Sequence, residues 1–131
     1  MSERELTLDL PGADLPGAGD PVITDVIAGA LASIDSALPG ASSQAAGVLG
    51  IEAGAEQVLL ILVDGLGYEL IQDHLGHTPT LRRMRNDIRS IHTVVPSTTA
   101  AAITAFGTGA RPGTTNMVGF SVAYGGGIMN L

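Results

Sequence analysis

The chain has 131 residues, of which 45% are hydrophobic, and its 6 basic and 13 acidic side chains give it a net charge of −7. This length and composition predict one small globular domain. The acidic balance argues against a nucleic-acid polymer as a partner, because the nucleic-acid phosphates would repel the chain. The sequence contains no cysteine, which excludes disulfides, thiolate metal sites and a cysteine nucleophile.

The N-terminal residues contain no basic stretch followed by an apolar core, so we expect no secretory signal peptide. No apolar run reaches the length of about 20 residues that a bilayer requires. These observations predict a cytoplasmic protein without membrane contact. Prolines and glycines in residues 1–19 predict a flexible N-terminal segment, which leaves residues 20–131 as the domain.

The first predicted helix follows Asp20, which would be its N-cap, with Pro21 as its first residue. Apolar residues recur at helical spacing from there to Ile34. The segment Leu38-Pro39-Gly40 should end this helix. Residues 41–56 are small and polar and predict a connection with room for a short helical turn.

An apolar run, residues 58–63, leads directly into Asp64. Six consecutive apolar residues are too few for a helix and predict a strand that is covered on both faces, as in a parallel sheet. Asp64 stands where that strand should end, and Gly65 and Gly67 suit the following turn. Open α/β sheets bind ligands outside the carboxyl ends of their strands, so Asp64 is a candidate site residue. The alternative is an ordinary turn aspartate.

Helical segments are then predicted over residues 68–75 and from Pro79 onward, followed by a second strand over residues 88–95. Strand, helix and strand in this order predict a parallel pair with a right-handed crossover. The expected fold class is therefore α/β, a parallel sheet with flanking helices. Three arginines of the second helix should form a solvated face, with phosphate binding as the alternative: Arg82, Arg83 and Arg85.

The second strand ends in Pro96-Ser97-Thr98-Thr99, and an alanine-rich helix follows as far as Phe106. Hydroxyl groups at a helix N-terminus suit an anion site, although Ser and Thr are also ordinary N-caps. Because parallel strands end at one sheet edge, Asp64 and one of these hydroxyls should lie close together. A divalent cation bound to both would lower the pKa of the hydroxyl and make it a nucleophile.

Residues 58–67 and 96–113 together resemble the type I phosphodiesterase/nucleotide pyrophosphatase family of the alkaline phosphatase superfamily. In that family an apolar strand ends in Asp-Gly, and a Pro-containing turn then precedes a Thr nucleophile. Thr-Gly, Pro and usually His-Gly come next in the chain. Aligning Thr108-Gly109 and Pro112 with this order places the nucleophile at Thr99.

The resemblance also implies that Asp64 is the first metal-binding aspartate and that Thr99 is a metal ligand as well as the nucleophile. The phosphoryl group would then lie against Thr99 and Ala100. A shift of the alignment by one residue makes Thr98 the alternative nucleophile. The family often has Asn at the position of Ala102, and it usually has His-Gly where this chain has Thr115-Asn116.

The resemblance covers about half of the chain and only the N-terminal part of an alkaline-phosphatase-like domain. Family members carry two divalent metal ions, zinc in our interpretation, and further Asp and His ligands downstream. Three histidines of this chain do not fall at ligand positions: His74, His77 and His92. We therefore expect a truncated domain whose remaining metal ligands lie outside this chain.

The implied function is metal-dependent hydrolysis of a small-molecule phosphodiester or nucleotide pyrophosphate, complete only in a longer chain. The 131-residue chain alone is expected to be inactive. The alternatives are an inactive fragment and a metal-dependent phosphomutase or phosphatase of the same superfamily.

Overall fold

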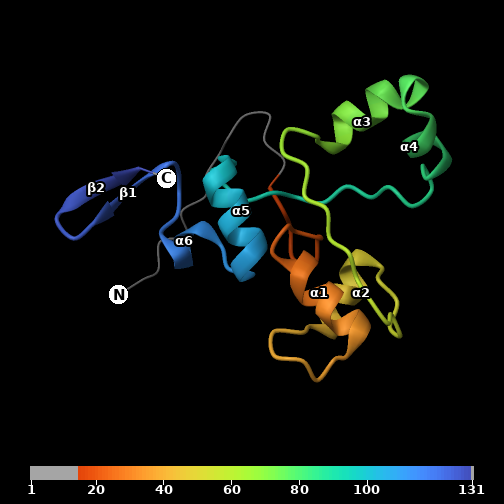
Figure 1. Ribbon diagram of the computed structural model, residues 1–131, viewed down its shortest axis with the longest axis horizontal. Helices are drawn as coiled ribbons and strands as arrows, with labels where there is room; N and C mark the ends of the chain where they lie inside the picture. The colour runs from red at the N-terminus through yellow and green to blue at the C-terminus, as the bar shows by residue number, and fades with distance from the viewer. Residues whose placement is uncertain (1–14, 131) are drawn as a thin grey trace.

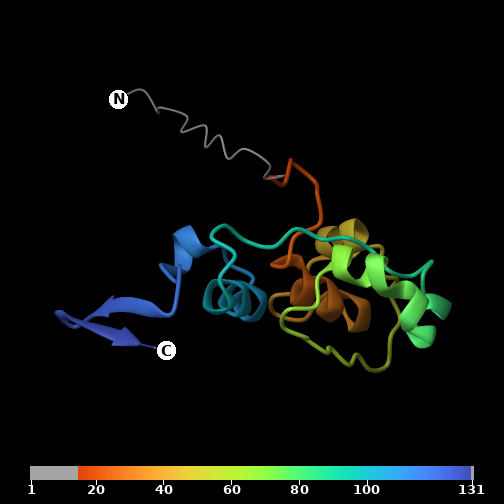
Figure 2. The same cartoon turned by 90° about the horizontal axis from the view of Figure 1, so that it is seen from above.

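The computed structural model describes residues 15–130, and Figures 1 and 2 show it from two directions. Its elements are α1 (Asp25–Ile34), α2 (Ser43–Leu49), α3 (Tyr68–His74), η1 (Leu75–His77), α4 (Pro79–Arg83), α5 (Thr99–Thr108), α6 (Pro112–Thr115), β1 (Ser121–Tyr124) and β2 (Gly127–Asn130). The chain thus mixes helix and strand, with helix predominant. Within residues 15–130, none of the helices has both the length and the apolar character that crossing a membrane requires.

The predicted flexible segment lies mostly outside the described residues, which begin at Leu15. The described end of it forms a turn around Asp20. The Asp20 carboxylate accepts a hydrogen bond from the Gly17 N–H at 2.7 Å, and the Asp20 N–H donates to the Gly17 carbonyl at 3.3 Å. Asp20 therefore stabilises this turn and does not cap a helix.

The first helix, α1, begins at Asp25, so the prediction of a start at Pro21 was wrong. The backbone before it pairs with a distant segment: the Ile23 N–H donates to the His92 carbonyl, and the His92 N–H donates to the Pro21 carbonyl, both at 2.8 Å. Val22 and His92 form a parallel bridge. Backbone groups used in this way cannot also form helical hydrogen bonds.

The connection predicted over residues 41–56 contains the helix α2, whose N-cap Ser42 accepts a hydrogen bond from the Ala45 N–H. This helix crosses α1 closely at Gly29. A Cβ atom at Gly29 would lie 3.1 Å from the Ala46 nitrogen, so a larger residue there would require α2 to shift by a few tenths of an ångström. The two helices pack through small residues.

The helical predictions in the middle of the chain are confirmed by α3 and α4. The chain continues from α3 through the 3₁₀ turn η1. Pro79 is the first residue of α4, as expected, but the Thr78 hydroxyl donates to the His74 carbonyl at 3.1 Å and does not cap α4. The Ala-rich helix is confirmed as α5, which continues two residues beyond the predicted end at Phe106 and is followed by Gly109 in the left-handed conformation.

The described residues do not form the predicted parallel sheet. Residues 58–63 contain no strand, and residues 88–95 contribute only the bridge at His92. The sheet that is present is the antiparallel hairpin β1–β2, which projects beyond α6 on the side away from α1 and α2 in both views (Figures 1 and 2). An apolar run forms a covered strand only where neighbouring strands can pair with it. Among the described residues, no strand lies beside residues 58–63.

Buried alanines lie on α1 and α2, and a small core cluster lies where α5 meets the segment that precedes it. Val94, Ala101 and Ala105 are buried there, and Ile23 and Ala102 pack against them. This cluster holds the N-terminal end of α5 against the bridge between Val22 and His92. It therefore fixes the helix on which the candidate nucleophile lies.

Candidate active site

Asp64 and Thr99 lie together, although 35 residues separate them in the chain. The Thr99 hydroxyl donates a hydrogen bond to the Asp64 carboxylate, with 3.4 Å between Oγ1 and Oδ2. Thr99 is the first residue of α5. Asp64 follows the extended run 58–63, and Gly65 turns the chain there with a φ of 71°. The turn thus holds the carboxylate beside the first turn of α5.

Both side chains line one cavity of about 390 Å³. The turn around Gly65 and residues of α5 both contribute to its lining, which also includes Thr93 and Ser97. This volume lies in the usual range for small-molecule sites, about 300–1,000 Å³. The arrangement leaves room for a small ligand against the Asp64–Thr99 pair.

Thr98 lies next to the pair but its hydroxyl has other partners. It accepts a hydrogen bond from the Ala101 N–H at 3.3 Å and donates to the Val118 carbonyl at 3.2 Å. These contacts make Thr98 the N-cap of α5 and join that helix to the segment after α6. A hydroxyl in such bonds is less available as a nucleophile, so the geometry favours Thr99 over Thr98.

The N-terminus of α5, where Thr99 lines the cavity, also carries backbone donors. The Ala101 and Ala102 N–H groups bond to Thr98, through its hydroxyl and its carbonyl oxygen. Among residues 15–130, no acceptor is bonded to the N–H of Thr99 or Ala100. Such donors, together with the positive end of the helix dipole, suit a phosphoryl group.

The site provides only part of the set of ligands that a catalytic metal ion needs. Asp64 and Thr99 offer two oxygens that are 3.4 Å apart, close enough to contact one cation. A catalytic zinc takes about three protein ligands, and the described residues contain no group of three His, Cys, Asp or Glu side chains that could hold a metal. Two histidines are engaged elsewhere: His74 Nδ1 is 2.9 Å from the Leu70 carbonyl, and His92 Nε2 is 3.9 Å from Asp20.

Comparison with known protein families decides the relationship. The family model described as type I phosphodiesterase / nucleotide pyrophosphatase matches residues 58–125, just over half of the chain. The chain belongs to this family. The match includes both Asp64 and Thr99, and it confirms the resemblance seen in the sequence. Comparisons with curated proteins and with solved structures gave no match.

Type I phosphodiesterases usually have His-Gly where this chain has Thr115-Asn116. The backbone conformation at Asn116 explains why asparagine can replace that glycine. Asn116 ends α6 with a φ of 57°, in the left-handed region. Glycine adopts that region readily, and asparagine tolerates it better than most other residues. The turn that normally follows the proline is therefore compatible with Asn116.

One polar residue of the cavity was missed in the sequence. Thr93 lines the same cavity as Asp64, and it comes from the segment that bridges to Val22. The available signal was a hydroxyl side chain near the carboxyl end of the strand predicted over residues 88–95, which is where site residues gather in α/β proteins.

Proposed function

We propose that this chain carries part of the active site of a metal-dependent phosphodiesterase or nucleotide pyrophosphatase, with Thr99 as the nucleophile. Its substrate is a small-molecule phosphate ester. The observation that carries the proposal is the contact between Thr99 Oγ1 and Asp64 Oδ2 at the N-terminus of α5. Membership of a family of phosphodiesterase and pyrophosphatase hydrolases supports it.

In this mechanism Thr99 has several roles, and Asp64 and Ala100 support it. The Thr99 hydroxyl loses its proton to solvent, and Thr99 Oγ1 forms a bond to phosphorus while the bond to the leaving alkoxide or phosphate breaks. Water then attacks phosphorus, which breaks the bond to Oγ1 and returns a proton to the Thr99 hydroxyl. The N–H groups of Thr99 and Ala100 bind the phosphoryl oxygens. Asp64 and Thr99 would hold a divalent cation, zinc in our proposal, which lowers the pKa of the attacking hydroxyl.

We also propose that residues 20–131 are part of a larger alkaline-phosphatase-like domain with a parallel sheet. Two observations support this. The site contains one carboxylate, whereas a two-metal site needs several more ligands. The apolar residues 58–63 are exposed, as expected of a central strand without its neighbours. Both would be explained by further strands and ligands, and the 131-residue chain would then be inactive alone.

The test is hydrolysis of bis(p-nitrophenyl) phosphate with added zinc, by the 131-residue chain and by the longest form that its gene encodes. In the active form, Thr99→Ala should lower the rate by at least about a thousandfold, as loss of a nucleophile does. Thr98→Ala is the matched control, because it removes a hydroxyl one residue away. It should keep most of the activity.

Asp64→Asn keeps the shape of the side chain and removes its charge, so it should lower the zinc content measured by elemental analysis. Retained turnover in Thr99→Ala, with loss in Thr98→Ala, would move the nucleophile by one residue. Zinc-dependent turnover by the 131-residue chain that Thr99→Ala abolishes would contradict the proposal of missing ligands. No turnover by the longest form would contradict the enzymatic proposal.

A further inference from the structure

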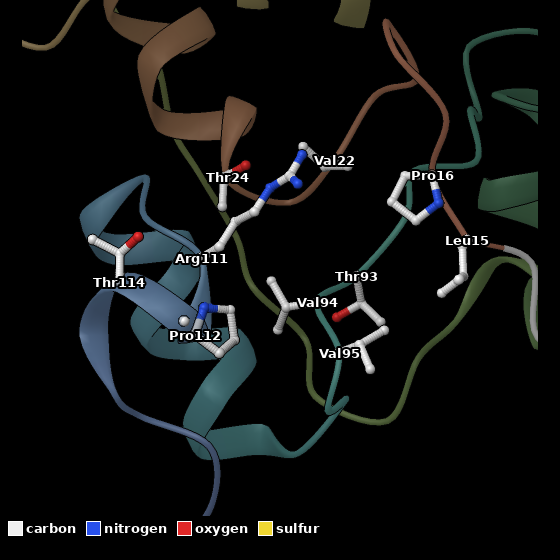
Figure 3. A pocket seen from close by; sticks show the side chains of 11 residues that line it. Leu15, Pro16, Val22, Thr24, Thr93, Val94, Val95, Arg111, Pro112 and Thr114 are labelled. Atoms are coloured by element: carbon white, nitrogen blue, oxygen red, sulfur yellow. The ribbon is translucent and has the colours of Figure 1, made fainter. Parts of the chain in front are cut away.

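A second cavity, larger than the first, lies on another part of the molecule. Its volume is about 490 Å³, within the usual range of about 300–1,000 Å³ for small-molecule sites. Three parts of the chain line it: residues 15–16 with Val22, the segment 93–95, and the start of α6 (Figure 3). It shares only Thr93 with the cavity that contains Asp64 and Thr99. We refer to it as the Arg111 cavity.

The Arg111 cavity is apolar on one side and has a cationic group on the other. Leu15, Pro16 and Val95 stand together on one side in Figure 3, and Arg111 extends from the start of α6 toward Thr24 and Val22 on the other. Three hydroxyl side chains add hydrogen-bonding groups to the lining: Thr24, Thr93 and Thr114. Pockets for small ligands commonly combine an apolar wall with a few polar groups of this kind.

The charge of Arg111 is not neutralised by an ion pair in the described part of the chain. No carboxylate there lies within 4.0 Å of its guanidinium nitrogens. Asp20 and Asp25 line a neighbouring cavity with Arg111. Their carboxylates accept other hydrogen bonds, from the Gly17 N–H at 2.7 Å and from the Val22 N–H at 3.0 Å.

We propose that the Arg111 cavity binds a small molecule with one oxyanion, a phosphate or a carboxylate, and a compact apolar part. The guanidinium fork of Arg111 matches either oxyanion through two parallel hydrogen bonds. The apolar part would lie against Leu15, Pro16 and Val95. The proposal does not depend on the function assigned to Asp64 and Thr99.

The net charge of −7 does not prevent this binding. At physiological ionic strength the Debye length is about 8 Å, so exposed carboxylates farther away are largely screened. The charges that matter most are therefore those nearest the cavity: the guanidinium of Arg111, which lines it, and the carboxylates of Asp20 and Asp25, which line only the neighbouring cavity. Higher salt should weaken the binding only moderately, because a single ion pair is involved.

The binding test is calorimetric titration of the 131-residue chain with phenyl phosphate, with EDTA present to remove metals. Benzoate tests the carboxylate alternative, and benzyl alcohol and inorganic phosphate test the two parts separately. We expect phenyl phosphate or benzoate to bind more tightly than either part alone. The tighter of the two assigns the head group.

The variant Arg111→Gln should weaken this binding by about tenfold or more, the usual effect of losing a charged hydrogen bond. Arg82→Gln removes the same charge from the exposed end of α4 and should leave the affinity unchanged. Leu15→Ala, at a half-exposed position, should weaken phenyl phosphate binding severalfold without affecting inorganic phosphate. Asp64→Asn should have no effect, because Asp64 lines the other cavity.

Amide chemical shifts locate the ligand. Changes at Thr24, Val95 and Thr114 support the proposal, whereas changes confined to Asp64, Ser97 and Thr99 would place the ligand in the other cavity and overturn it. Equal affinity of wild type and Arg111→Gln would also overturn it. If wild type binds none of the probes, the proposal is also overturned. A lower melting temperature in Arg111→Gln would then indicate that Arg111 has a purely structural role beside Asp20 and Asp25.

Discussion

The two halves of the candidate site lie in very different surroundings. Thr99 begins α5, whose Ala101 and Ala105 are 1% exposed against Val94. Asp64 follows a run of six apolar residues that are all exposed, with Leu59 at 83% and Ile61 at 77%. The candidate nucleophile Thr99 is therefore held by packing that the described residues supply themselves, whereas the Asp64 carboxylate is held by a turn at the end of an uncovered segment.

This difference shows what each half requires. An alanine-rich helix needs little partner surface, because its small side chains pack closely against one neighbouring segment. A strand of Val, Leu and Ile residues needs cover on both faces and hydrogen-bond partners at both edges. Three predictions test the comparison, in order of decreasing expected effect.

The largest expected effect comes from placing a charge in each half. Ala105→Asp would bury a carboxylate without a partner, which should lower the free energy of unfolding by about 3–5 kcal/mol. The matched variant Ile61→Asp places the same group at an exposed position and should leave that free energy nearly unchanged. Denaturant unfolding followed by circular dichroism measures both.

Ile61→Asp should also reduce self-association, measured by light scattering, because exposed apolar segments favour it. Strong destabilisation by Ile61→Asp would contradict the difference in packing between the two halves of the site. It would mean that residues 58–63 are covered in solution, by a second copy or by other parts of the protein.

The sequence predicted the local features of this fold better than the distant ones. A hydroxyl cap before the Ala-rich helix and Pro79 at a first helical position follow from backbone chemistry within a few residues, and the structure has helix starts at both places, with Thr98 as the cap of α5. The start of α1 was mispredicted because the backbone at Val22 pairs with His92, a contact that helical periodicity does not reveal.

The candidate site was predicted in the same uneven way. The proximity of Asp64 and Thr99 was expected from two strand ends meeting at a sheet edge, yet the structure brings them together without that sheet. The roles of Asp64, Thr99 and Ala100 stay predictions. No binding role was predicted for Arg111, because a single arginine before a proline has no sequence pattern that indicates a cavity.

A smaller effect should come from the contact between α1 and α2, which belongs to the packed region. Gly29→Ala adds a Cβ atom 3.1 Å from the Ala46 nitrogen, and a backbone atom cannot move aside without shifting α2. We expect a loss of about 1–3 kcal/mol in the free energy of unfolding, typical of overpacking. Thermal unfolding would report this as a lower melting temperature.

Gly47→Ala is the matched control, because Gly47 lies within α2 and a Cβ atom there meets nothing within 4 Å. It should raise the free energy of unfolding by about 0.5–1 kcal/mol, since alanine is the better helix former. Equal stabilisation by Gly29→Ala would mean that the two helices separate at little cost, and that the packed region is less rigid than its geometry indicates.

The smallest effect separates the two neighbouring threonines at the site. Thr98→Ala removes a hydroxyl that accepts from the Ala101 N–H and donates to the Val118 carbonyl, so it should cost about 1 kcal/mol in the free energy of unfolding. Thr99→Ala removes only the 3.4 Å contact to the exposed Asp64 and should cost at most about 0.5 kcal/mol. Paired denaturant titrations resolve this difference. A larger loss in Thr99→Ala than in Thr98→Ala would mean that the Asp64 contact holds residues 58–67 against α5, and the two halves of the site would then be one structural unit.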